Sequence, residues 1–193
     1  MTHDFYERLA FSQGSNISAD IEILRRAIPN CVGVRKTSLK ADRAGVDYIA
    51  LLAGGAEIGI DAKLREKGAS AYWTTGEAEL ALETWSVFPD GKHTPKEGWT
   101  LSTATDVDLI LFRFHPADWP ESYLLPFQML RMVFMRKRAD WETRYPKKIQ
   151  DSGDWFSQAL FVPVSVVLRE LMCVMQIKTG SEKCERHSQD SSD

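Results

Sequence analysis

The segment from residue 58 to residue 64 limits the folds open to this chain more than any other part of the sequence. It reads Ile-Gly-Ile-Asp-Ala-Lys-Leu, so apolar residues alternate with Gly59, Asp61 and Lys63. Because side chains alternate between the two faces of a β-strand, this pattern predicts a strand with Asp61 and Lys63 on one face. Burial of an aspartate and a lysine in a sheet costs free energy unless the two are paired or perform chemistry. The alternative is an edge hairpin on which the two residues form a surface ion pair.

A partner strand is predicted directly before this segment, over residues 46–52. It begins with Val46 and Asp47, and Gly54 and Gly55 lie between the two strands. A pair of glycines between two extended runs is typical of a hairpin turn. The hairpin would bring a third charged residue, Asp47, into the neighbourhood of the first strand.

The length of the hairpin loop decides which face of the sheet Asp47 occupies. A two-residue loop would place Asp47 opposite Ala62, on the wrong face for a shared site. A three-residue loop over residues 54–56 would place Asp47 opposite Lys63 and diagonal to Asp61. Three-residue loops with a left-handed glycine are common. Convergence of the three charged residues therefore requires a loop with an odd number of residues.

The rest of the chain alternates between helical and extended patterns. The predicted helices cover residues 3–11, 18–28, 123–142 and 165–177, and the further strands cover residues 80–87, 108–114 and 159–164. This order predicts an α/β (α+β) fold in which a single mixed β-sheet is flanked by helices. A chain of 193 residues fits one domain. We expect this domain over residues 1–177, followed by a polar C-terminal tail over residues 178–193.

The composition argues against several classes of protein. The formal net charge of −3 disfavours a strongly basic nucleic-acid coat protein, and no apolar stretch approaches the roughly 20 residues of a transmembrane helix. Cys31, Cys173 and Cys184 form no CxxC pair, which disfavours a zinc site and a disulfide framework. We therefore expect a reduced, cytoplasmic protein without a membrane partner.

Asp47, followed after 13 residues by Asp61-Ala62-Lys63, resembles the motif of the PD-(D/E)XK nuclease superfamily, which has the restriction-endonuclease-like fold. In that family, an acid on one strand and an acid-x-lysine on the next hold a divalent metal at a phosphodiester bond. The resemblance extends roughly over residues 18–114 and includes a leading helix, a hairpin that carries the acids, and a further strand and helix. Val46 stands where the family motif often has a proline.

The residue types suit this chemistry. Carboxylates are hard oxygen ligands for Mg²⁺ or Mn²⁺, which retain bound waters and accept phosphate oxygens as further ligands. The resemblance implies that Asp47, Asp61 and the carbonyl group of Ala62 bind the metal. Such a metal lowers the pKa of a bound water. The resemblance also makes Asp47, Asp61 and Lys63 catalytic, with Lys63 positioning or activating the attacking water and stabilising charge in the transition state.

Many members of this family add an acid from the leading helix. Glu22, on the helix predicted over residues 18–28, is our candidate for this further catalytic residue, and Glu83 is the competing candidate. Asp20 and Glu22 also fall in the first turn of that helix, where carboxylates stabilise the positive end of the helix dipole. The position of Glu22 therefore has two explanations.

Basic residues gather in two parts of the chain. Residues 131–148 contain seven lysines and arginines against two acids, a local net charge of +5, and a second group lies within residues 25–43. Such clusters bind nucleic acid by neutralising phosphates and releasing counterions, although a single basic residue on a helix is more often only solvated. The residues expected to bind DNA are Arg35, Lys36, Lys40, Arg131, Arg136, Lys137 and Arg138.

These observations favour a metal-dependent nuclease that hydrolyses DNA phosphodiester bonds, of the small resolvase or phage-nuclease type. The alternative is a non-catalytic binding module on the same fold, for example a viral or mobile-element protein that inhibits a host defence complex. A structural or assembly subunit is a third hypothesis. The expected partner is DNA, and a second copy of the chain in a homodimer and a protein of a host defence system are further candidate partners. The hypotheses differ in whether Asp61 and Lys63 are required for function.

Overall fold

The computed structural model describes residues 17–37, 45–103, 105–151 and 153–176. The helix predicted over residues 3–11, the basic residue Lys40 and the C-terminal tail over residues 178–193 lie outside this part of the chain. Within the described residues, no helix combines the length and the apolar character needed to cross a membrane.

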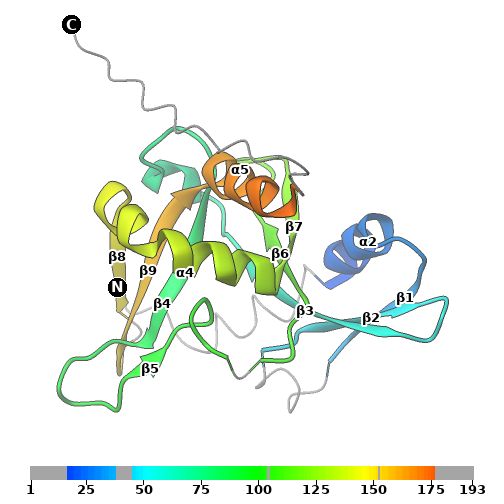
Figure 1. Ribbon diagram of the computed structural model, residues 1–193, viewed down its shortest axis with the longest axis horizontal. Helices are drawn as coiled ribbons and strands as arrows, with labels where there is room; N and C mark the ends of the chain where they lie inside the picture. The colour runs from blue at the N-terminus through cyan, green and yellow to red at the C-terminus, as the bar shows by residue number, and fades with distance from the viewer. Residues whose placement is uncertain (1–16, 38–44, 104, 152, 177–193) are drawn as a thin grey trace, which may run out of the picture.

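The helices and strands of the described chain carry their labels in Figure 1. The helices are α2 (Ile17–Ala27), α4 (Phe127–Arg144) and α5 (Val164–Met175), with a short 3-10 helix η1 (Ala69–Tyr72). Sheet A has the strand order β1-β2-β3-β6-β7 and consists of β1 (Cys31–Lys36), β2 (Tyr48–Leu52), β3 (Glu57–Leu64), β6 (Leu109–Arg113) and β7 (Ser122–Pro126). Sheet B has the order β5-β4-β9-β8 and consists of β4 (Glu79–Val87), β5 (Lys96–Glu97), β8 (Lys147–Asp151) and β9 (Phe156–Pro163).

The α+β class is confirmed, but the strands form two sheets instead of the single mixed sheet that we expected. In sheet A, β3 pairs with β6 in parallel and all other neighbours are antiparallel. Sheet B is antiparallel throughout. A pattern of apolar residues indicates that a segment is a strand, but it does not indicate which other strand pairs with it, and this explains the error.

The start of the helix predicted over residues 123–142 is also wrong. Residues 122–126 form strand β7, which pairs with β6, and α4 begins at Phe127. Pro126 explains the change, because a proline has no N–H to donate and pushes the residue before it towards an extended conformation. Helix α2 and strands β3, β4, β6 and β9 lie close to their predicted bounds.

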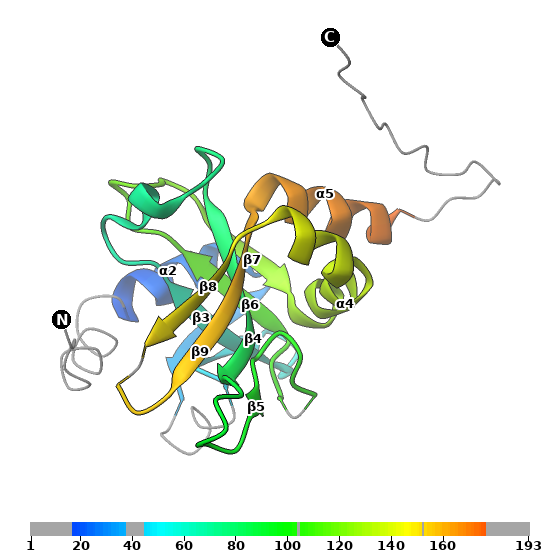
Figure 2. The same cartoon turned by 90° about the vertical axis from the view of Figure 1, so that its left-hand side faces the viewer.

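Sheet A is covered by different elements on its two faces. Leu24 of α2 packs with Tyr48 and Ala50 of β2, Ile60 of β3 and Leu111 of β6, and all five are buried. Helix α2 therefore covers one face of sheet A, and both views show it on the far side of this sheet from α4 and α5 (Figures 1 and 2). The residues that alternate with these on β3, which include Asp61 and Lys63, face the other way.

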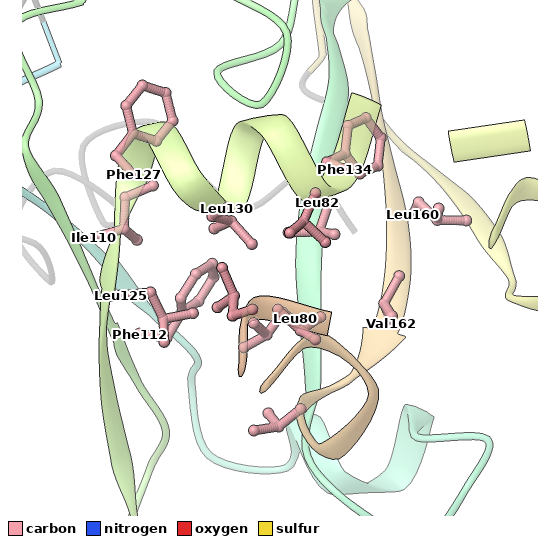
Figure 3. Close-up of a cluster of buried hydrophobic side chains, with 14 of the residues drawn as sticks. Leu80, Leu82, Ile110, Phe112, Leu125, Phe127, Leu130, Phe134, Leu160 and Val162 are labelled. Atoms are coloured by element: carbon pink, nitrogen blue, oxygen red, sulfur yellow. The ribbon is translucent and has the colours of Figure 1, made fainter. Parts of the chain in front are cut away.

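The larger core lies between sheet A, sheet B and the helices α4 and α5. Apolar side chains of β4 and β9 point towards α4 and towards β6 in this core (Figure 3). The buried side chains labelled there are Leu80, Leu82, Ile110, Phe112, Leu125, Phe127, Leu130, Phe134, Leu160 and Val162. Because side chains alternate, the residues between them, Ala81 and Glu83 on β4 and Ala159 and Phe161 on β9, lie on the opposite face of sheet B.

The buried carboxylate of Asp20 links helix α2 to sheet A. Asp20 accepts a hydrogen bond from the Tyr48 hydroxyl (2.8 Å) and forms an ion pair with Arg113 of β6 (3.0 Å). Burial raises the pKa of Asp20, while the Tyr48 hydrogen bond and the charges of Arg113 and Lys36 act in the opposite direction. Asp20 therefore does more than complement the helix dipole, since it links α2 to two strands of sheet A.

We expect Asp20→Ala to lower the free energy of unfolding by about 3 kcal/mol, because removal of one partner of a buried ion pair leaves the other without compensation. Urea unfolding measures this change. Glu22→Ala is the matched control on the same helix, since the ion pair of Glu22 with Arg26 is exposed and such pairs contribute about 1 kcal/mol or less. Equal effects of the two substitutions would contradict this role for Asp20.

Candidate functional site

The hairpin between β2 and β3 has a loop of three residues, Ala53–Gly55. The Leu52 N–H donates to the carbonyl oxygen of Ala56 (2.9 Å), which closes the loop at its base. Gly55 has a φ of 82°, in the left-handed region that favours glycine. The loop therefore has the odd number of residues that a shared site requires.

The register of this hairpin places Asp47 opposite Asp61. Tyr48 pairs with Ile60, and the Asp47 N–H donates to the carbonyl oxygen of Ile60 (2.9 Å), which extends the pairing to the residue directly before the start of β2. Our three-residue loop was placed one position too late in the sequence, so we expected Asp47 opposite Lys63. The observed register brings the two acids closer together than that expectation did.

The carboxylates of Asp47 and Asp61 are partly shielded from water, and both contact polar groups of β3. Oδ2 of Asp47 accepts a hydrogen bond from the Ala62 N–H (2.8 Å), and Asp61 is only 6% exposed. Burial raises the pKa of Asp47 to about 7, against the lowering effect of the Ala62 hydrogen bond, and the negative charge of Asp61 adds to the rise. The pair therefore concentrates more negative charge than its surroundings compensate.

Lys63 supplies the positive charge next to this pair. Its Nζ lies 2.8 Å from Oδ2 of Asp61 and 5.6 Å from the centroid of the Trp99 ring. Burial alone would lower the pKa of Lys63, but the carboxylates of Asp61, Asp47 and Glu83 outweigh burial and raise it. Lys63 is therefore a protonated cation with carboxylates around it.

A cleft of about 430 Å³ lies between the C-terminal end of β3 and the outer face of sheet B. The charged and aromatic residues that line it are Lys63, Arg65, Glu66, Glu83, Trp99, Phe112, Lys148 and Phe161. Lys63 belongs both to the cleft and to the acid pair, through its contact with Asp61. The acid pair therefore lies beside the cleft and not in isolation on the sheet.

Glu83 is held in place on the sheet B side of the cleft. Its Oε2 accepts hydrogen bonds from the Ser86 hydroxyl (2.8 Å) and from the backbone N–H of Trp99 (3.2 Å). The pairing of β4 with β9 shifts between Glu83 and Trp85, which is a β-bulge at Thr84. Bulges change the direction of a side chain and are frequent next to active sites.

Of the two candidates for a further acid, the structure brings only Glu83 close to Lys63. Glu83 lines the cleft, and its charge acts on Lys63. Glu22 lies on the exposed face of α2, where it forms an ion pair with Arg26. The helix covers the face of sheet A that is opposite to Asp61, so Glu22 is not part of the group around Lys63.

The structure does not gather the expected DNA-binding residues at the cleft. Helix α4 packs on the core face of sheet B, so the four expected residues that it carries, Arg131, Arg136, Lys137 and Arg138, lie across that sheet from the cleft. Arg136 is exposed, whereas the charge of Lys36 acts on the buried Asp20. Four of the group have partners within the fold: Arg35 with Glu57 (3.3 Å), Arg131 with the carbonyl oxygen of Leu101 (3.1 Å), Lys137 with Glu170 (2.9 Å) and Arg138 with Glu142 (2.6 Å).

Arg65, Lys148 and Phe161 line the cleft but were missed as site residues. The sequence was sufficient to predict Arg65 as a site residue, because Asp61, Lys63 and Arg65 follow one another at the two-residue spacing of one strand face. Lys148 lies on a polar edge strand, and its neighbour Phe161 belongs to β9. No local pattern links Lys148 and Phe161 to the acid pair.

Oxygen ligands for a divalent metal are present at the acid pair. The carboxylates of Asp47 and Asp61 and the backbone carbonyl of Ala62 fit Mg²⁺ or Mn²⁺, which use few protein ligands and complete their coordination with water and phosphate oxygens. In the described parts of the chain, no group of three or more His, Cys, Asp or Glu side chains is placed to hold a metal ion. A metal at this site would therefore depend on backbone, water or substrate oxygens for its remaining ligands.

We expect the stability of the metal-free protein to depend on pH through Asp47. Its pKa is about 7 in the folded chain and about 4 in the unfolded chain. The folded state therefore binds the additional proton between these values, and stability falls as the pH rises from about 4 to about 7. Asp47→Asn should remove this fall and raise the free energy of unfolding at pH 8 by on the order of 1–3 kcal/mol.

Urea unfolding at pH 5 and pH 8, in the presence of EDTA, measures the effect of Asp47→Asn. Asp154→Asn is the matched control, because Asp154 is exposed. If the wild-type protein and Asp47→Asn lose the same stability between the two pH values, the carboxylate pair does not carry this pH dependence.

We expect Gly98→Ala to disturb the wall of the cleft that carries Glu83. A Cβ atom at Gly98 would lie 2.3 Å from the carbonyl oxygen of Glu83, so the backbone of one of the two segments must move. The expected cost is about 1–3 kcal/mol of unfolding free energy, as for other overpacked positions. Gly54→Ala is the control, because a Cβ atom there meets no atom within 4 Å. Equal melting temperatures for the two variants would contradict the close approach at Gly98.

Comparisons with known proteins assign no family to this chain. No family model, no curated protein and no solved structure matches it. The functional argument below therefore depends on the residues and geometry of the site.

Proposed function

We propose that this chain is a metal-dependent nuclease that hydrolyses DNA phosphodiester bonds. The observation that carries the proposal is the convergence of Asp47, Asp61 and Lys63 beside a cleft that contains further positive charge. Two opposed carboxylates next to a lysine suit a divalent metal and a phosphate together. An edge hairpin with a surface ion pair does not account for this arrangement, because Asp61 is buried.

The topology of sheet A supports the same proposal. Helix α2 precedes three antiparallel strands, β1, β2 and β3, and β6 then pairs with β3 in parallel. Asp61 lies on β3, the central strand of this sheet, and Asp47 lies directly before the neighbouring strand β2. This order agrees with the helix and hairpin arrangement that the resemblance to the PD-(D/E)XK nucleases implies, and we propose a restriction-endonuclease-like core on this basis.

Each residue of the site has a role that its position supports. A bound Mg²⁺ or Mn²⁺ would supply an activated water and stabilise charge on the phosphate. Asp47, Asp61 and the Ala62 carbonyl are the ligands that would hold it. Lys63, fixed by Asp61, places a positive charge where negative charge develops during hydrolysis.

Glu83 is our candidate for the further acid in place of Glu22. It lies on the wall of the cleft, and its hydrogen bonds to Ser86 and Trp99 fix its orientation. A carboxylate at this position orients Lys63 from the side of sheet B and can accept a hydrogen bond from a water in the cleft.

We expect Asp61→Asn and Lys63→Gln each to lower the rate of DNA cleavage by at least about 100-fold, because both remove charge stabilisation at the reacting phosphate. The assay uses labelled single-stranded, duplex and branched DNA with Mg²⁺ or Mn²⁺. Glu83→Gln should reduce the rate more than Glu22→Gln.

The chain contains a matched control for this experiment. Asp90-Gly91-Lys92 repeats the acid-x-lysine pattern, but Asp90 caps a turn by accepting hydrogen bonds from the backbone of Lys92 and His93. Asp90→Asn and Lys92→Gln should retain full activity. Absence of cleavage and of metal binding by the wild-type protein would overturn the proposal and favour a non-catalytic binding module.

A further inference from the structure

Arg65 and Lys148 are two positive charges that share one aromatic ring in the cleft. Arg65 follows β3, and its Cζ lies 5.1 Å from the centroid of the Phe161 ring on β9. Nζ of Lys148, on the neighbouring strand β8, lies 4.6 Å from the same centroid. Because both contact one ring, the two charged groups lie within about 10 Å of each other.

Neither of these cations forms an ion pair with a carboxylate of the described residues. Lys148 donates a hydrogen bond to the carbonyl oxygen of Tyr72 (2.8 Å), which fixes its position without neutralising its charge. Burial lowers the pKa of Arg65, as expected for a guanidinium that leaves water without a carboxylate partner. Two neighbouring like charges repel each other, so an anion that enters the cleft would stabilise them.

Arg65 lies on the same face of the chain as Asp61 and Lys63, but farther along it. The Arg65 N–H donates to the carbonyl oxygen of Arg113 (2.8 Å), so the pairing with β6 continues past the end of β3. Four residues of an extended strand span about 13 Å. This separation of the two backbone positions, together with the Arg65 guanidinium lying against the Phe161 ring on β9, favours different phosphates for the acid pair and for Arg65 and Lys148.

We propose that Arg65 and Lys148 form an anion subsite for a second phosphate of the nucleic-acid strand, next to the phosphate at Asp47 and Asp61. Arginine binds phosphate through two parallel hydrogen bonds, and lysine adds a point charge. The cleft volume of about 430 Å³ is in the range of small-molecule sites, which fits the backbone of one strand. The choice of ligand rests on the proposed function, whereas binding of the anion does not require catalysis.

The test measures binding of a short, fluorescein-labelled single-stranded oligodeoxynucleotide in EDTA, so that cleavage does not interfere. We expect Arg65→Gln and Lys148→Gln each to raise the Kd about tenfold, as for the loss of a hydrogen bond to a charged group. Each variant should also reduce the slope of log K against log salt concentration by about 0.7. Arg169→Gln is the matched control, because Arg169 is exposed on α5, which packs with the core on the other side of sheet B. Melting temperatures verify that the variants are folded.

A chemical substitution in the ligand shows whether the contact is to a phosphate. Oligonucleotides with one neutral methylphosphonate, placed at each position in turn, should bind the wild-type protein more weakly at one position. In the double variant Arg65→Gln, Lys148→Gln this loss should disappear, because the partner of that phosphate is absent. Inorganic phosphate should compete for the wild-type site and not for the double variant.

The inference and the proposed function fail in different ways. If the wild-type protein cleaves DNA but both single variants bind the oligonucleotide as the wild type does, the subsite is overturned and the nuclease remains. If no metal supports cleavage but binding depends on Arg65 and Lys148, the subsite is supported and the nuclease is overturned. A methylphosphonate effect that persists in the double variant, or absence of binding by the wild type, also overturns the subsite.

Discussion

Asp47 and Asp61 face each other across neighbouring strands, and the surrounding structure has to compensate for this approach of two carboxylates. Within sheet A, the Ala62 N–H and the Lys63 ammonium group lie against the pair. Lys63 in turn lies against Trp99 and near Glu83, which belong to the region around sheet B. The electrostatics of a single hairpin therefore depend on a correct relative position of the two sheets.

Strand β3 connects the parts of the molecule that create this position. It pairs with β2 on one side and with β6 on the other, and its C-terminal end forms one wall of the cleft. Arg113, at the end of β6, forms the buried ion pair with Asp20 that holds α2. Displacement of β3 would thus affect the acid pair, the cleft and the packing of α2 together. The apolar core between α4, β4 and β9 supports sheet B, and the outer face of that sheet forms the other wall of the cleft.

The sequence was sufficient for those features that depend on local spacing. The alternation over residues 58–64 predicted β3 and the shared face of Asp61 and Lys63, because the period of a strand is a local property. The position of the loop was beyond such reasoning, since a start at Ala53 and a start at Gly54 both give three-residue loops but differ by two residues in register. Sheet B was missed because its central pair joins residues more than 70 positions apart. For the same reason, the choice between Glu22 and Glu83 required three-dimensional information, whereas the spacing of Arg65 from Lys63 was available and not used.

The hairpin and the cleft also differ in how they form. Asp47 and Asp61 are brought together by a short hairpin, whereas Arg65 and Phe161 are almost 100 positions apart in the sequence. The entropy cost of closing a chain segment grows with its length, and contacts between distant residues slow folding. The chain can therefore assemble its carboxylates before it brings Arg65 and Lys148 together beside them. In a partly folded chain the acid pair would already have Lys63 of the same strand beside it, whereas Arg65 and Lys148 meet at the Phe161 ring when β8 and β9 have joined β4.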